Sequence, residues 1–291
     1  MKIFRLSVFL YFCLLMTMAS AQKPAAKKPA NAPLRVMSYN IRYATKTDSI
    51  NYWDNRKSKV AGLLRYHQAD LIGVQEALHR QLTDLEKDLP EFAWYGVGRD
   101  DGKISGEFSA IYYRKNRFKP LDKGTFWLSE TPEKPGSKNW DAAITRLCSW
   151  VKFQDLKTGH TFFHFNTHYD HMGKIAREKS SEILVAKIKA IAGTTPVVIT
   201  GDFNVPQTAP AYATMINGTT IKDAQFISET PHYGPLGTSG GFLVNRPLKA
   251  KIDYVFVKGP IRVLQHAVIT DQWDNYYPSD HLPVLAEIEI K

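Results

Sequence analysis

The chain has 291 residues, of which 44% are hydrophobic and 23% are charged, and these ordinary values exclude a largely disordered chain or a coiled coil. It contains one long apolar run, which excludes a protein with several membrane spans. The formal net charge of +10 suggests an anionic partner such as nucleic acid, and two cysteines exclude a disulfide scaffold or a Cys-rich zinc site.

The first 33 residues do not resemble a folded domain. Lys2 and Arg5 precede an apolar run over residues 6–18, and Ala-Ser-Ala at 19–21 is typical of a cleavage site. We therefore expect a secretory signal peptide over residues 1–21, because the apolar run is short for a transmembrane anchor. The mature protein would be secreted or periplasmic, with no stable membrane span.

Residues 22–33 are rich in Ala, Pro and Lys, and their composition predicts a solvated linker. Five of the 38 basic residues and none of the acidic ones lie in residues 1–33, so residues 34–291 carry a net charge of +5. Half of the apparent basicity thus lies outside the predicted domain, and the charge gives weak support for nucleic acid.

Residues 34–291 show no break in composition and are predicted to form a single domain in which strands alternate with a few helices. Apolar residues at helical spacing predict helices over 60–67, 78–89 and 183–191, the last ended by Gly193. Buried or alternating runs predict strands over 35–43, 70–74, 110–113, 118–126, 146–153, 161–167, 196–200, 252–257 and 283–290. Many strands with few helices favour an α+β fold in which helices cover two packed sheets.

Polar residues interrupt or end several of these strands. A buried carboxylate or amide is costly unless it is paired, hydrogen-bonded or bound to a metal. Each occurrence alone has a structural explanation, but strand ends at one edge of a sandwich would bring them into one cleft. The residues are Asn40, Glu76, His168, Asp170, His171, Asp202, Asn204, Asp253, Asp280 and His281.

The chemistry of this set is that of hard oxygen ligands together with two or more histidines. Carboxylate and amide oxygens suit Mg²⁺, or Mn²⁺ as a substitute, better than zinc. The sequence contains no nucleophilic Ser or Cys motif and no Gly-rich nucleotide loop. These features favour metal-assisted hydrolysis of a phosphate ester.

Six motifs in order resemble the endonuclease/exonuclease/phosphatase superfamily, which includes deoxyribonuclease I: MSYNIR, GVQEAL, FNTHYDH, TGDFNVP, KIDYVFV and PSDHLPV. The resemblance covers nearly all of residues 34–291, which would be the catalytic domain of a compact secreted member. It implies a four-layer α/β/β/α sandwich, with two mixed β-sheets packed face to face and helices outside.

The resemblance also implies roles for individual residues. Glu76 would be the main Mg²⁺ ligand, with Asn40 beside the metal or phosphate and Asp280 in support. Asn204 and His168 would hold or stabilise phosphate oxygens. His281, oriented by Asp253, would contact the scissile phosphate, and either Asp202 or the His281–Asp253 pair would be the general base, with Asp202 favoured.

Further residues are candidates for contact with the substrate. Asp170 and His171 could line the pocket or brace His168, and Arg177 could point at an anion or be a solvated helix residue. Trp127 and Arg146 flank a polar loop over residues 129–139 and resemble substrate-side positions of small secreted members, although Trp127 could equally be a core residue. A Gly-rich segment, 233–242, is predicted to form a loop near the cleft.

Three other classes of protein could carry some of the same residues. A calcineurin-like metallophosphoesterase would need an Asp-x-His motif upstream of Gly201, and none is present. A zinc hydrolase would use His164, His168 and His171, and a non-catalytic binding module would be expected to have lost metal ligands that remain here. We therefore expect a monomeric phosphodiesterase, nuclease-like by default, although a phospholipid head group, a nucleotide or a phosphomonoester would suit the same site.

Overall fold

The computed structural model describes residues 32–291. The predicted signal peptide and residues 22–31 of the predicted linker lie outside the described residues. Among those described, no helix has the length and apolar character needed to cross a membrane.

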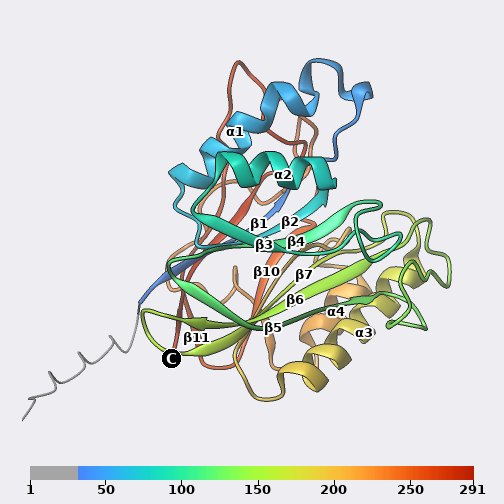
Figure 1. Cartoon of the computed structure of the whole chain (residues 1–291), viewed down its shortest axis with the longest axis vertical. Helices are drawn as coiled ribbons and strands as arrows, with labels where there is room; N and C mark the ends of the chain where they lie inside the picture. The colour runs from blue at the N-terminus through green and yellow to red at the C-terminus, as the bar shows by residue number, and fades with distance from the viewer. Residues whose placement is uncertain (1–31) are drawn as a thin grey trace, which may run out of the picture.

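Two six-stranded sheets form the centre of the fold (Figure 1). The first sheet has the spatial order β11 (Ile261–Val268), β12 (Val284–Ile290), β1 (Leu34–Asn40), β2 (Leu71–Ala77), β4 (Phe108–Arg114) and β3 (Phe92–Tyr95). The second has the order β5 (Phe118–Trp127), β6 (Leu147–Asp155), β7 (Thr161–His168), β8 (Val197–Asp202), β10 (Asp253–Lys258) and β9 (Ile221–Asp223). Only the central pairs β1–β2 and β7–β8 are parallel, so both sheets are mixed.

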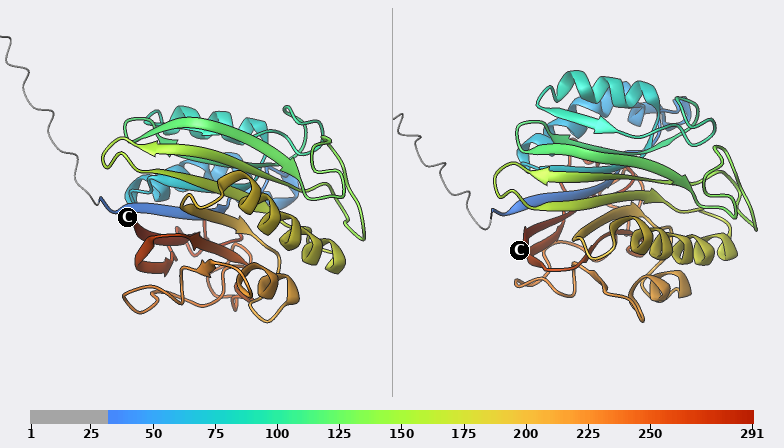
Figure 2. Two further views of the ribbon diagram at one scale, coloured as in Figure 1. Left: turned by 90° about the horizontal axis from the view of Figure 1, so that it is seen from below. Right: turned by 60° about the horizontal axis from the view of Figure 1, so that its bottom comes forward.

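Helices cover the outer face of each sheet (Figures 1 and 2). Helices α1 (Trp53–Tyr66) and α2 (His79–Asp88) pack on the first sheet, preceded by the short 3-10 helix η1 (Lys46–Asn51). Helices α3 (Lys174–Ala192) and α4 (Pro210–Ile216) pack on the second sheet. The α+β fold of two sheets between helical layers, expected from the sequence, is confirmed.

The core has three parts that follow from this layering. One lies between the sheets and includes Val36, Ile111, Val151 and Val255, and the other two lie beneath the helices. Strand β12 shows the expected alternation, since every second residue from Val284 is buried. The inner faces therefore hold the sheets together and leave their ends free to carry polar groups.

Helices α1 and α3 begin earlier than predicted, whereas α2 lies within its predicted bounds. Helix α3 begins at Lys174, nine residues before the predicted start, because Ala176, Ser180 and Ser181 line the buried face of its first turns and give no strong apolar signal. Its end is as expected: Gly193 caps the helix with φ 54°, a conformation that favours glycine. Strands β3, β9 and β11 and helix α4 were not individually predicted from the sequence.

Candidate active site

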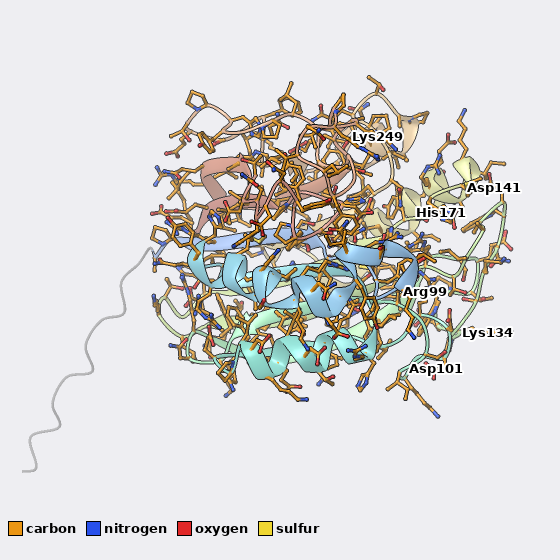
Figure 3. The ribbon with its side chains drawn as sticks, turned by 90° about the horizontal axis from the view of Figure 1, so that it is seen from above. Arg99, Asp101, Lys134, Asp141, His171 and Lys249 are labelled. Atoms are coloured by element: carbon orange, nitrogen blue, oxygen red, sulfur yellow. The ribbon has the colours of Figure 1, made fainter. Side chains whose placement is uncertain are left out.

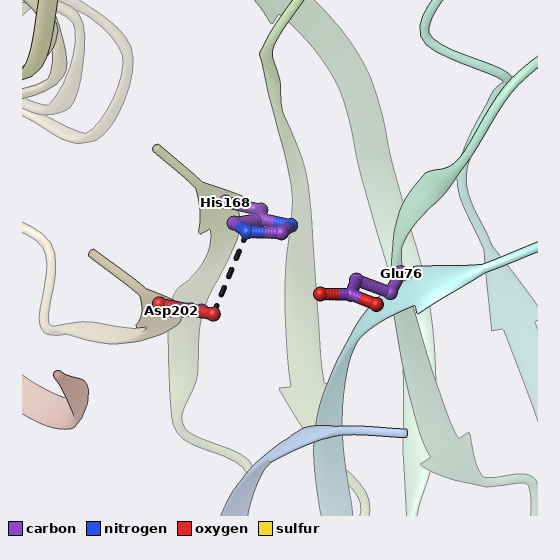
Figure 4. A group of neighbouring side chains, drawn as sticks. All are labelled: Glu76, His168 and Asp202. Carbon is purple, nitrogen blue, oxygen red and sulfur yellow. Dashed lines mark ion pairs between the residues drawn. The ribbon is translucent and has the colours of Figure 1, made fainter. Parts of the chain in front are cut away.

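Three neighbouring strands of the second sheet place polar side chains at the same level. The register pairs His168, the last residue of β7, with Asp202, the last residue of β8. It also pairs Asp202 with Asp253, the first residue of β10. His168 Nε2 lies 3.4 Å from Asp202 Oδ2, as the dashed line in Figure 4 shows. Strand pairing thus brings together residues that are far apart in the sequence.

Asn40 and Glu76 belong to the first sheet, and they face these second-sheet residues at the same end of the sandwich. Figure 4 shows Glu76 facing His168 and Asp202 across the gap between the sheets. The Asn40 amide donates to Glu76 Oε1 and to Asp202 Oδ2, both at 3.0 Å, and thereby links the two sheets. Asn40 Oδ1 accepts the N–H of Arg42, so its N–H groups, rather than its oxygen, face the two carboxylates.

Backbone geometry at two of these residues is unusual. Glu76 has φ 61° and Asn204 has φ 51°, values that non-glycine residues adopt rarely. Glu76 lies in a β-bulge of β2, between Val74 and Ala77 in the pairing with β4. Such strain is concentrated at functional sites, where surrounding contacts hold it.

His281 is oriented by a chain of hydrogen bonds. Its Nδ1 lies 2.9 Å from Asp253 Oδ2, which also accepts the hydroxyl hydrogen of Thr238 at 2.6 Å. Thr238 belongs to the Gly-rich segment predicted to lie near the cleft, and it accepts the N–H of Asp253 at 3.2 Å. This segment therefore braces the His–Asp pair, and Ser239 forms a β-bridge with His281.

His168 has a defined tautomer. The Asn204 amide donates to the carbonyl of Tyr169 and to His168 Nε2, each at 3.0 Å. Since a carbonyl only accepts, the amide nitrogen must face both groups, and Nε2 must be unprotonated. The ring proton is then on Nδ1, which lies 4.0 Å from Glu107 Oε2.

Burial and neighbouring charges shift the pKa values of Asp202, His281 and His168 in different ways. Burial, reinforced by the Asp253 carboxylate, raises the pKa of Asp202 to about 7. Burial alone would lower the pKa of His281, but Asp253 and Asp202 outweigh it and hold the pKa well above its ordinary value. Burial and the charges of Arg146 and Arg99 lower the pKa of His168 well below its ordinary value. Near neutral pH, His281 is therefore charged and His168 is neutral.

The raised pKa of Asp202 has a measurable consequence for the metal-free protein. A carboxyl group with a folded pKa near 7 and an ordinary value of 3.8 contributes stability below about pH 4, and this is lost as pH rises through 7. In EDTA, we expect the free energy of unfolding to fall between pH 5 and 8 by more in the wild type than in Asp202→Asn. Urea unfolding at the two pH values measures this difference, expected on the order of a few kcal/mol. An equal fall in both proteins would contradict it.

The donor set fits a divalent cation. Ligand atoms of Glu76, His168 and Asp202 lie within 4.8 Å of one another, and so do those of Asp202, Asp253 and His281. Asp253 Oδ1 is buried without a hydrogen-bond partner among the described residues, as expected of an oxygen available to a ligand. Asp280 lies at the same edge, 4.0 Å from Arg42 Nε, and burial raises its pKa.

The predicted substrate-side residues have different environments. Arg146 and His171 line the cavity and contact each other, with 3.3 Å between Nη2 and Nδ1. Asp170 is buried and accepts backbone N–H groups of Met172, Gly173 and Ile144, and Arg177 donates to the Asp170 carbonyl. These contacts favour a bracing role for Asp170 and Arg177.

Trp127 is also placed behind the cavity wall. Only 4% of its surface is exposed, and its indole N–H donates to the carbonyl of Arg99 at 2.7 Å. This contact holds the loop that carries Arg99. The burial of Trp127 agrees with the alternative that it is a core residue.

A cavity of about 630 Å³ opens on a cluster formed by Glu76, His168, Asp202 and His281, here called the catalytic cluster because of its predicted role. Its wall includes Arg42, Tyr43, Arg99, Glu107 and Lys249, which the sequence did not indicate as site residues. Figure 3 shows Arg99, His171 and Lys249 on separate loops toward one end of the molecule. Glu107 precedes its strand instead of following one, and Lys249 lies in an irregular segment, so neither gives a strand-end signal.

The zinc site considered from the sequence would need three histidines to converge. His164 is fully buried with its Nε2 2.8 Å from Thr200 Oγ1, and burial lowers its pKa to about 3. His171 instead contacts Arg146. Within residues 32–291, no candidate metal group combines these histidines.

This sandwich, with carboxylates, amides and histidines gathered at the ends of its central strands, is a phosphoesterase fold. Residues 37–281 match the model of the Endonuclease/Exonuclease/phosphatase family. A crystal structure of a family protein from Bacteroides thetaiotaomicron is 39% identical, covers 90% of this chain and 99% of its own, and has a TM-score of 0.86. The chain therefore belongs to the endonuclease/exonuclease/phosphatase family, whose members are hydrolases of phosphoester bonds.

Two further structures are informative. A mannosyl-6-phosphatase from Bacteroides thetaiotaomicron is 39% identical over 88% of this chain and 99% of its own, with a TM-score of 0.85. TDP2 from D. rerio, complexed with single strand DNA product, covers 88% of this chain and 99% of its own with a TM-score of 0.71. Its identity of 17% shows a shared fold alone.

Proposed function

We propose that this protein is a divalent-metal-dependent phosphatase that hydrolyses the phosphate monoester of a sugar or a similar small polyol. The observation that carries the proposal is the cavity of about 630 Å³, whose wall joins the catalytic cluster to several cationic side chains. This volume is typical of small-molecule sites. The similarity to a mannosyl-6-phosphatase supports the same substrate class.

The charges around the cavity suit a monoester, which carries more negative charge at neutral pH than a diester does. Arg99 lies beside the carboxylates of Glu107 and Asp100, and Arg146 beside those of Glu107 and Asp170, so acidic side chains balance both arginines. Lys249 lines the cavity and makes no ion pair among the described residues. Lys249 therefore offers unpaired positive charge to a phosphate dianion.

Glu76 and Asp280 are the residues that would hold the cation, with Mg²⁺ preferred and Mn²⁺ as a substitute. Bound there, it would polarise a phosphoryl oxygen and lower the pKa of water. The N–H groups of Asn40 hold Glu76 in place for this purpose and fix the Asp202 carboxylate beside it.

The proton transfers follow from the different pKa values of the site residues. Asp202, with a pKa of about 7, is matched to accept a proton from the attacking water near neutral pH. His281 remains protonated beside Asp253, so it binds the phosphate as a cation rather than acting as the base. These properties support the preference for Asp202 over His281 as general base.

The neutral His168 has a complementary task. Its Nδ1–H is the available donor, because Nε2 accepts from Asn204. We assign this group to a hydrogen bond with a phosphoryl oxygen as charge develops there.

The nucleic-acid substrate expected by default stays a prediction, as does a phospholipid head group. The sequence also leads us to propose that the enzyme acts outside the cytoplasm after cleavage behind Ala21, which N-terminal sequencing of exported protein tests.

A substrate panel tests the proposed function directly. With Mg²⁺ or Mn²⁺, the protein is expected to hydrolyse mannose 6-phosphate with a kcat/KM at least about tenfold above that for bis-p-nitrophenyl phosphate, since Lys249 and the bound cation favour the dianion. EDTA should abolish release of inorganic phosphate, and added Mn²⁺ should restore it. Single-stranded DNA and phosphatidylinositol phosphate vesicles complete the panel, and faster cleavage of either would overturn the assignment to a small polyol.

A further inference from the structure

A fully buried asparagine crosses the interface between the two sheets directly beneath the candidate active site. Asn166 lies on β7 of the second sheet, two residues before His168. Its side-chain amide donates to the carbonyl of Val74 at 2.9 Å and to that of Ala110 at 2.8 Å. Both carbonyls belong to the first sheet, so this one side chain bonds two strands of the facing layer.

The two carbonyls mark the start of the β2 bulge. Val74 and Ala110 form the last regular pair between β2 and β4, and the register then shifts before Ala77. Glu76 lies inside this shift with φ 61°. Asn166 therefore holds both strands at the point where the backbone departs from regular pairing to turn Glu76 toward the cluster.

The acceptor side of Asn166 is equally well defined. Its Oδ1 accepts from Gln75 Nε2 at 2.7 Å and from Thr200 Oγ1 at 3.0 Å. These two donors require the amide nitrogen to face the carbonyls. Gln75 itself lies in the bulge, so Asn166 contacts the bulged segment through both ends of its amide.

The sequence of β2 is adapted to this close approach. A Cβ on Gly73 would lie 2.5 Å from Asn166 Oδ1 and 1.9 Å from Thr200 Oγ1. Any side chain at position 73 would therefore displace the amide from the bulge.

We propose that Asn166 is a positioning residue that holds the β2 bulge and so aims the carboxylate of Glu76 at the metal site. This inference rests on the metal site of the proposed function. Buried residues that orient a metal ligand typically contribute about 10–100-fold to metal affinity or activity when they are removed. A merely structural Asn166 would affect the melting temperature and leave metal affinity unchanged.

The test is calorimetric titration of Mn²⁺ into full-length protein without substrate. Asn166→Ala is expected to bind Mn²⁺ about tenfold more weakly than the wild type. The matched control is Ser149→Ala, because Ser149 pairs with Asn166 across β6 and β7, is fully buried, and has a hydroxyl without a partner among the described residues. It is expected to bind Mn²⁺ like the wild type.

Should Asn166→Ala fail to fold, Thr200→Val is nearly isosteric and removes one donor to Asn166 Oδ1, together with the hydroxyl partner of His164 Nε2. It is expected to weaken Mn²⁺ binding about threefold. Wild-type affinity in the folded variant, with or without a lower melting temperature, would overturn the inference, as would a wild type that binds no Mn²⁺. Weaker binding in the variant together with a wild type inactive on sugar phosphates would support the inference and contradict the proposed function.

Discussion

Replacing Glu76 by Gln is expected to lower kcat/KM by about a thousandfold or more. The change keeps the shape of the side chain but removes the negative charge that faces His168 and Asp202 (Figure 4). Loss of a bound cation forfeits several kcal/mol of transition-state stabilisation, and about 4 kcal/mol corresponds to a thousandfold. Steady-state kinetics with increasing Mn²⁺ measures the effect.

The fold should survive this substitution, because the Glu76 carboxylate is at the surface of the cavity and is not part of the core. Glu182→Gln, on the exposed face of α3 and paired with Lys179, is the control and should retain full activity. A Glu76→Gln enzyme within tenfold of the wild type would contradict the assignment of Glu76 as a metal ligand.

Replacing His281 by Asn is expected to lower kcat by about 10²–10⁴-fold, the range for loss of a positioned acid–base or charged group. The buried Asp202 and Asp253 carboxylates lie 3.7 Å and 2.9 Å from His281 Nδ1 and keep the imidazole protonated. The variant loses this cation from the phosphate site and leaves Asp253 with Thr238 but without a charged partner. Single-turnover kinetics on mannose 6-phosphate measures the chemical step.

A second His–Asp pair provides the matched control. His67 Nε2 lies 2.9 Å from Asp271 Oδ2, and neither residue lines the cavity. His67→Asn should therefore retain wild-type kcat. Equal losses in the two variants would show that disruption of a His–Asp pair acts through stability, and the role given to His281 would fail.

Much of the fold and site was predictable because the signals are local. The alternation of β12 and the apolar stripe of α2 report which face is buried, independently of what packs against it. Polar residues that end apolar strands, such as His168 and Asp202, stand out for the same reason. The first turns of α3 and the short α4 lack large apolar residues at clear spacing, so their bounds depend on tertiary packing.

The sequence pattern did not indicate the site residues whose role depends on a neighbour that is distant in the sequence. Arg99 belongs to the cavity wall because Trp127, at the end of β5, donates to its carbonyl, and Glu107 pairs with the Arg99 guanidinium. The placement of Asp170 behind the wall depends on backbone N–H groups from two segments.

The sequence by itself determined the two-sheet class, the ends of the central strands and the oxygen-rich chemistry found there, since these depend on residue type and periodicity. Only the tertiary structure decided that His168 lies beside Asp202, that Asn40 turns its N–H groups to the carboxylates, and that Asn166 holds the β2 bulge. The two hydrogen bonds of Asn40, for example, join residues that are 36 and 162 positions apart in the sequence. The distances in such contacts set the pKa values of the site residues. Charge and hydrogen-bond energies depend on separation and burial, which a linear pattern does not contain.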